Sequence, residues 1–144
     1  MLGYCAVDYE RIPTMTILVV DDEAAFGRLL ARALRVLGHE VTVAVHPVDA
    51  LELFEKGRFD AVITDIEMPM MNGIELARAM RGQCADIPIA FCTGSPPHDA
   101  PRRQASEIGR VLPKIWRLDD VRRVVGELFF QRQHKKAPGE RPLG

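Results

Sequence analysis

Acidic, hydroxyl and basic side chains follow apolar runs of the sequence at the points where those runs end. Asp21 and Asp22 follow the first run, and Asp65, Thr93 and Lys114 follow later ones. Carboxylates gathered within about 4 to 5 Å repel one another by several kcal/mol per pair at an effective dielectric near 20. Either one of them stays protonated or a cation binds, and an all-oxygen site with few protein ligands suits Mg²⁺ or Mn²⁺.

These residue types together fit phosphoryl transfer. A divalent ion can coordinate one phosphoryl oxygen while Lys114 and Thr93 contact the other two. Asp65 would be the nucleophile, and the acyl phosphate that it forms is reactive enough to hydrolyse again, which makes a reversible switch. Simpler interpretations exist. An aspartate can cap a helix and stabilise it by about 1 kcal/mol, Thr93 can be a turn residue, and Lys114 can be a solvated charge. The coincidence of all the positions favours the chemical role.

The elements that would position these side chains alternate along the chain. Short, mostly apolar runs predict strands at residues 16–20, 40–44, 59–64, 87–92 and 110–112. Apolar residues at helical spacing predict helices at residues 26–37, 47–57, 72–81, 102–108 and 118–129. The alternation indicates an α/β fold, a doubly wound five-stranded parallel sheet of order 2-1-3-4-5, with ligands at the carboxyl ends near strands one and three.

This strand order determines which side chains can meet. The ends of strands one and three are neighbours, so Asp22 and Asp65 lie side by side and Thr93 lies one strand beyond. Lys114 must reach back across roughly 10 Å, which its flexible stem allows. The segment SPPHDAP at residues 95–101 carries three prolines, so no helix can follow strand four directly. The short helix after it offers only Ala105 and Ile108 to the core, and we expect it to be mobile.

Composition narrows the functional classes. With 144 residues, 47% hydrophobic and 27% charged, the chain is expected to form one globular domain. Its net charge of -1 gives no general attraction to nucleic acid or to an anionic membrane. No apolar run approaches the roughly 18 residues of a membrane-spanning helix. The cysteines lack metal-ligand spacing, which favours reduced thiols and a cytoplasmic location.

Four motifs resemble the signature of response-regulator receiver domains. They are ILVVDDE at residues 17–23, VITDIEMPMMNG at 62–73, FCTG at 91–94 and LPK at 112–114. The resemblance covers about residues 15–131 and implies the flavodoxin-like receiver fold. The expected organisation is an N-terminal extension at 1–14, a receiver domain at 15–132 and a tail at 133–144, too polar to fold and therefore disordered.

The resemblance also implies roles for the site residues. The metal would be bound by the carboxylates of Asp22 and Asp65 and by the main-chain carbonyl of Glu67. The carboxylate of Asp21 would assist. Asp65 would be the phosphoacceptor. The Thr93 hydroxyl would turn toward the phosphoryl group, and Lys114 would bridge that group to the carboxylate. The three methionines of the second motif are expected to fill the loop and the core.

Two positions depart from the family pattern. Most receivers carry an aromatic residue three positions before the lysine, which swings inward on activation, whereas this chain has Val111. The Lys-Pro step of the family, normally cis, is replaced by Lys114-Ile115, where a cis bond would cost about 3 kcal/mol. Val111 indicates that the output surface is rewired.

The best interpretation is a stand-alone response regulator, not an enzyme. It would accept a phosphoryl group on Asp65 from a histidine kinase or phosphotransfer protein and signal by contact with a downstream protein. One alternative is a protein-interaction module of the same fold that works without phosphorylation, which Val111 and Ile115 favour.

A second alternative is an enzyme or a flavin protein on the same sheet order. A phosphohydrolase with an aspartyl nucleophile would need a general acid two residues later, where Glu67 stands. A flavin phosphate would be repelled by the acidic residues 21–23. Direct DNA binding is not expected, because the basic residues near the C-terminus precede no helix-turn-helix. The sequence leaves a homodimer open.

Overall fold

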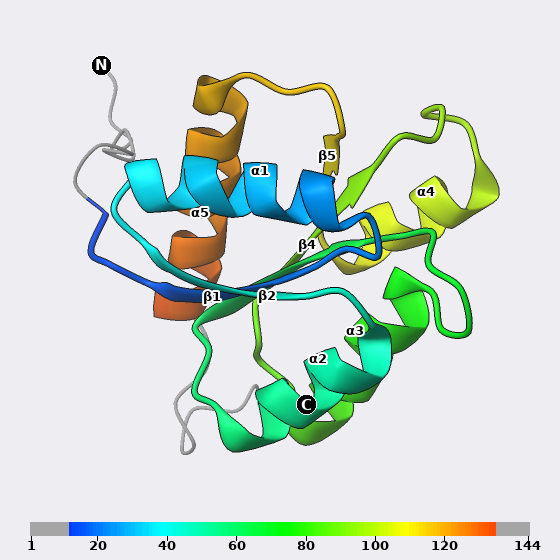
Figure 1. Ribbon diagram of the computed structural model, residues 1–144, viewed down its shortest axis with the longest axis horizontal. Coiled ribbons are helices and arrows are strands. Elements are labelled where there is room, and N and C mark those ends of the chain that lie inside the picture. Colours follow the sequence, from blue (N-terminus) through cyan, green and yellow to red (C-terminus); the bar gives the residue numbers. More distant parts are fainter. Residues whose placement is uncertain (1–11, 135–144) are drawn as a thin grey trace.

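A five-stranded parallel sheet forms the centre of the molecule (Figure 1). In this computed structural model, which describes residues 12–134, the strand order is β2-β1-β3-β4-β5. The strands are β1 (Thr16–Val20), β2 (Glu40–Ala44), β3 (Ala61–Asp65), β4 (Ile89–Thr93) and β5 (Arg110–Pro113). The predicted α/β class and the strand order 2-1-3-4-5 are confirmed.

Within residues 12–134, five helices cover the two faces of this sheet (Figure 1). They are α1 (Ala24–Val36), α2 (Pro47–Lys56), α3 (Gly73–Gln83), α4 (Ala100–Ile108) and α5 (Leu118–Gln133). Leu34 of α1 and Val124 of α5 pack in one apolar cluster, whereas Phe54 of α2 and Leu76 of α3 pack in the other. No helix of the described part is both long and apolar enough to cross a membrane.

Strands β3 and β4 begin two residues later and end one residue later than predicted. At the start of β3, Asp60 donates its N–H to Thr16 O at 2.7 Å, and its Oδ2 accepts the N–H of Thr16 at 2.8 Å. Before β4, Pro88 has no N–H to give to the ladder. At the other end, the register pairs Asp65 with Cys92. Asp65 is therefore the last residue of a buried strand, which fixes its backbone.

Helix α4 is short and loosely attached to the sheet. It begins at Ala100, two residues earlier than predicted, because Pro101 lies in the first turn, where no backbone N–H is needed. The prolines do keep helix from following β4 directly. Of α4 only Ala105 is fully buried, while Ile108 packs half-buried against the core. The weak packing matches the prediction, and the mobility of α4 stays a prediction.

The expected terminal segments fall largely outside the described residues. Those include residues 1–11 of the proposed extension and residues 135–144 of the proposed tail. Within the described part, Ile12 packs against the cluster below α1 and α5, and Thr14 Oγ1 donates to Gly38 O at 2.9 Å. The domain boundaries stay a prediction.

Candidate functional site

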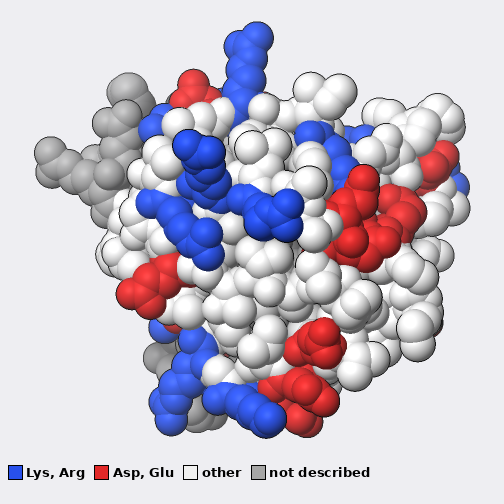
Figure 2. Space-filling model, viewed as in Figure 1, with Lys and Arg blue, Asp and Glu red and all other residues white. Residues whose placement is uncertain are grey.

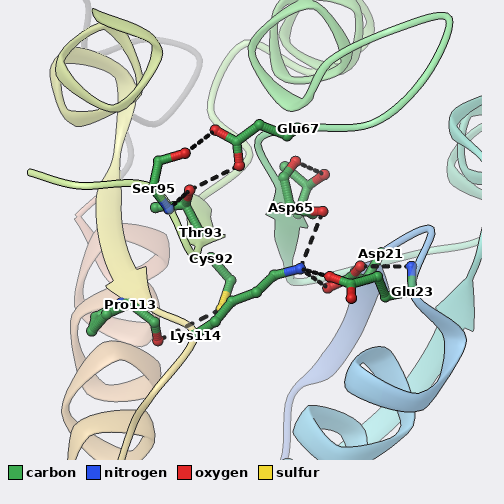
Figure 3. A network of polar contacts seen from close by, with 10 residues as sticks. Asp21, Glu23, Asp65, Glu67, Cys92, Thr93, Ser95, Pro113 and Lys114 are labelled. Atoms are coloured by element: carbon green, nitrogen blue, oxygen red, sulfur yellow. Dashed lines mark hydrogen bonds and ion pairs between the residues drawn. The ribbon is translucent and has the colours of Figure 1, made fainter. Parts of the chain in front are cut away.

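The carboxyl ends of the strands bring the predicted site residues together (Figure 3). Asp21 and Asp22 directly follow β1, Asp65 and Thr93 end β3 and β4, and Lys114 directly follows β5. Asp21 and Asp65 are each 3% exposed and Thr93 is 0% exposed, whereas Asp22 faces solvent. In Figure 2, acidic side chains gather beside the first turn of α1, at the same edge of the sheet.

Three carboxylates form a compact oxygen cluster at this edge. One oxygen from each of Asp21, Asp22 and Asp65 lies within 4.8 Å of the others. Asp65 Oδ1 is buried and accepts no hydrogen bond from the described residues. A buried acceptor without a donor is costly, and a hard cation with oxygen ligands would satisfy it. The residues present therefore fit Mg²⁺.

The electrostatics of the cluster follow from burial. Loss of water raises the pKa of the Asp65 carboxyl from 3.8 to about 7, and the nearby charge of Asp21 adds to this increase. Burial also raises the pKa of Asp21, although the N–H of Glu23 and the ammonium of Lys114 oppose it. Both carboxylates are thus held where their charges are unfavourable without a cation.

Lys114 supplies one positive charge to the cluster. Its Nζ lies 3.3 Å from both Asp65 Oδ2 and Asp21 Oδ2, and 2.5 Å from Glu23 Oε1. Burial alone would lower the pKa of Lys114, but the hydrogen bond to Glu23 and the neighbouring carboxylates outweigh it and raise the pKa. Sequence reasoning placed Lys114 here but missed Glu23, whose only signal was a third acidic residue after β1.

The backbone and an aromatic ring position this lysine. Its N–H donates to Thr93 O at 2.8 Å, which continues the pairing of β4 with β5. Its ammonium lies 4.8 Å from the centre of the Phe26 ring, and Trp116 meets the same ring edge-on at 6.4 Å. No peptide bond of the described residues is cis, so Lys114 reaches the site without the usual cis step after it.

The Glu67 side chain contacts the hydroxyl groups at the end of β4. Thr93 Oγ1 donates to Glu67 Oε1 at 2.9 Å, and Ser95 Oγ donates to Oε2 at 2.7 Å (Figure 3). Sequence reasoning assigned Glu67 a role only through its main-chain carbonyl, which stays a prediction. It missed Ser95, for which the only signal was a second hydroxyl two residues after Thr93.

The loop after Asp65 returns tightly to the strand. A Cβ on Gly73 would lie 2.0 Å from Asp65 O, so only glycine fits there. The loop methionines divide: Met68 is buried and Met71 packs half-buried, as expected, whereas Met70 is 95% exposed with a φ of 73°. Met68 and Met71 thus contribute to the core, and Met70 lies in the loop with its side chain in solvent.

A family model places this arrangement among known domains. The model described as the response regulator receiver domain matches residues 17–125. This chain belongs to that family. Receiver domains act in two-component signalling, where they interact with histidine kinases and downstream targets, and they are not enzymes in the usual sense.

Curated relatives of this receiver chain are longer proteins. The response regulator MprA of Mycobacterium sp. (strain KMS) is 42% identical over 77 residues, which are 54% of this chain and 34% of the relative. MprA of Mycobacterium avium (strain 104) is 39% identical over 79 residues, 55% of this chain and 35% of the relative. The chain spans about a third of the length of the curated relatives it matches.

Solved receiver structures resemble it along most of its length. The response regulator TrrA of Thermotoga maritima, solved in complex with Mg²⁺-BeF, is 32% identical with a TM-score of 0.70, over 80% of this chain and 99% of that one. The chemotaxis protein CheY4 of Vibrio cholerae is 26% identical with a TM-score of 0.73, over 81% and 99%. Val111 packs half-buried against the core cluster of α2, α3 and α4.

Proposed function

We propose that Asp65 accepts a phosphoryl group from a histidine kinase or phosphotransfer protein. One observation carries the proposal. Asp65 has one oxygen 3.3 Å from Lys114 Nζ and a second, buried oxygen that accepts no hydrogen bond within residues 12–134 and lies beside two other carboxylates. The unsatisfied oxygen suits a bound cation, which leaves the oxygen beside Lys114 to attack phosphorus in line.

Mg²⁺ would be held by Asp22, Asp65 and the main-chain carbonyl of Glu67, with Asp21 assisting. When bound, the ion supplies positive charge to the phosphoryl oxygens. Mn²⁺ presents the same oxygen preference, so it is proposed as a substitute. Support for Mg²⁺ comes from the oxygen cluster here and from the Mg²⁺-BeF complex of TrrA.

The remaining chemistry belongs to the side chains of this chain. An Asp65 oxygen forms the new bond to phosphorus as the bond from phosphorus to the donor nitrogen breaks, and the donor imidazole leaves with that electron pair. Lys114 neutralises the charge of the transferred group from one side. Thr93 would donate its hydroxyl proton to a phosphoryl oxygen. Hydrolysis of the resulting acyl phosphate resets the switch.

A phosphodonor assay tests the phosphoacceptor directly. Incubation with phosphoramidate and Mg²⁺ should add the mass of one phosphoryl group, and Asp65→Asn should abolish the adduct. Asp86→Asn, at an exposed aspartate between α3 and β4, is the matched control and should be labelled normally. An adduct that persists in Asp65→Asn would refute the assignment.

Fluorescence gives a second, label-free test. Trp116 touches Phe26, and Phe26 touches Lys114, so a change at the lysine should alter the indole emission. Titration with Mg²⁺ and then beryllofluoride should give two saturable changes. A flat titration would support the alternative of a receiver-fold interaction module without phosphorylation, which Val111 favours.

The hydrolase alternative is weakened by the position of Glu67. Both of its carboxylate oxygens accept hydrogen bonds, from the Thr93 and Ser95 hydroxyls, so neither carries a proton placed for a leaving group. We propose signalling by protein contact, without direct DNA binding by these residues. Stand-alone action, a cytoplasmic location and a homodimer stay predictions, because the chain spans only about a third of its curated relatives.

A further inference from the structure

The Glu67 carboxylate accepts hydrogen bonds from both hydroxyl groups at the end of β4 (Figure 3). The Thr93 hydroxyl donates a hydrogen bond to Oε1, and the Ser95 hydroxyl donates one to Oε2. Ser95 N–H donates to Thr93 Oγ1 at 3.0 Å, which fills an acceptor position of the same hydroxyl. Thr93 is completely buried, whereas Glu67 is exposed and Ser95 half-buried, so bulk water is excluded from the Thr93 hydroxyl but reaches the Glu67 carboxylate.

A threonine hydroxyl has a single proton to donate. While Thr93 donates it to Glu67, the same hydroxyl cannot donate to a phosphoryl oxygen on Asp65. We propose that Glu67 is a positioning residue that holds Thr93 and Ser95 in the resting arrangement. A phosphoryl group on Asp65 must then replace Glu67 as the acceptor of the Thr93 hydrogen bond. This inference rests on the proposed function, because it requires a phosphoryl group on Asp65.

The same network continues into α4. Arg102 Nη1 donates to Ser95 O at 2.8 Å, so the first turn of α4 is tied to the residue that Glu67 holds. Ala105 is the only fully buried residue of α4, and the start of the helix is also held by polar contacts, from Arg102 to Ser95 O and from Arg103 to His98 O. Val111 offers no aromatic ring for the task. Displacement of Ser95 together with Thr93 therefore reaches α4 through Arg102.

Two variants of Glu67 separate its hydrogen bonds from its charge. Glu67→Ala removes both, whereas Glu67→Gln removes the charge and keeps an oxygen that accepts from Thr93. Each variant is titrated with Mg²⁺ first, and beryllofluoride is then added at saturating Mg²⁺ with Trp116 fluorescence as the signal. Glu67→Ala should bind beryllofluoride about five-fold tighter than wild type, which is the effect of one released hydrogen bond. The affinity of Glu67→Gln should stay within about two-fold of the wild-type affinity.

The outcomes distinguish the two levels of the proposal. Equal tightening in both variants would overturn the inference, because repulsion by the charge would then account for the whole effect. Normal beryllofluoride binding by wild type with no gain in Glu67→Ala would overturn the inference and leave the proposed function standing. No beryllofluoride binding by wild type would overturn both.

Amide hydrogen exchange of the full chain tests the transmission to α4. In wild type, amides of residues 100–108 should exchange about five-fold faster once Mg²⁺ and beryllofluoride are bound, because the Arg102 contact is released. Arg102→Ala should exchange fast before and after ligand, while Gln104→Ala, at an exposed position of the same helix, should respond like wild type. An unchanged α4 in wild type, or a normal response in Arg102→Ala, would overturn the transmission.

Discussion

The two ends of the parallel strands bury polar groups in opposite ways. At the amino ends, the ring Nδ1 of His39 accepts the N–H of Met15 at 3.0 Å, and Asp60 accepts the N–H of Thr16 and pairs with Arg132 at 2.9 Å. At the carboxyl ends, carboxylates crowd together and one buried oxygen has no donor in the described part of the chain. At the amino ends, polar groups thus stabilise the fold. At the carboxyl ends, polar groups stay available for a ligand, which lowers the stability of the fold.

The largest effect is expected where the backbone closes around the phosphoacceptor. Gly73→Ala would put a methyl group 2.0 Å from Asp65 O, and we expect a loss of about 3 kcal/mol in unfolding free energy. Gly82→Ala is the control in the same helix, because its Cβ would meet no atom within 4 Å. It should stabilise by about 0.5 to 1 kcal/mol. Similar urea midpoints for the two variants would contradict the tight return of this loop.

Addition of Mg²⁺ should stabilise the protein through the carboxylates at the carboxyl ends of the strands and not through groups at the amino ends. At a concentration of 100 times its dissociation constant, Mg²⁺ should raise the free energy of unfolding by about 2.7 kcal/mol. Asp65→Asn should lose this gain, while Asp60→Asn, at the amino ends, should keep it. Thermal melts with EDTA and with Mg²⁺ measure the difference. A full gain in stability in Asp65→Asn would show that Asp65 is not needed to bind the metal.

The pH dependence of stability should have opposite signs at the two ends. In EDTA, the protonated Asp65 stabilises the folded chain fully below its ordinary pKa of 3.8, and this contribution is lost as the pH rises through about 7. Asp65→Asn should therefore overtake wild type by on the order of 2 kcal/mol between those limits. Urea unfolding at a series of pH values tests this. Parallel curves for the two proteins would show that Asp65 ionises normally.

His39 should give the smallest effect and the opposite slope. Burial lowers the pKa of its imidazole below 6.5, so the unfolded chain binds a proton that the folded chain resists. Stability should fall as the pH drops below 6.5, because the neutral ring is the one that accepts from Met15. In His39→Phe this slope should flatten, at the cost of one hydrogen bond. A slope that survives the substitution would assign it to other groups.

The central part of the site could be predicted from the sequence. Asp65, Thr93 and Lys114 come together because each ends or follows a strand, and the strand order fixes which ends are neighbours. Asp65 and Thr93 lie within the strands and not after them, since the ladder extends further than an apolar run reveals. The late start of β3 required the contact of Asp60 with Thr16, 44 residues away in sequence.

The contacts made by exposed acids could not be predicted. Glu23 meets Lys114 across 91 residues, and Glu67 meets Thr93 and Ser95 across 26 and 28 residues. Such contacts depend on side-chain rotamers at the sheet edge, which residue type and spacing do not determine. The sequence motif identified Glu67 as part of the site, but only coordinates distinguish a main-chain ligand from a side-chain acceptor.

The ammonium group of Lys114 has a consequence for how the domain is made. It is covalently part of the chain, so a cation accompanies the carboxylates of Asp21 and Asp65 from the moment β5 joins the sheet. The chain therefore carries within its own covalent structure part of the positive charge that its buried carboxylates need, whether or not a divalent ion is bound.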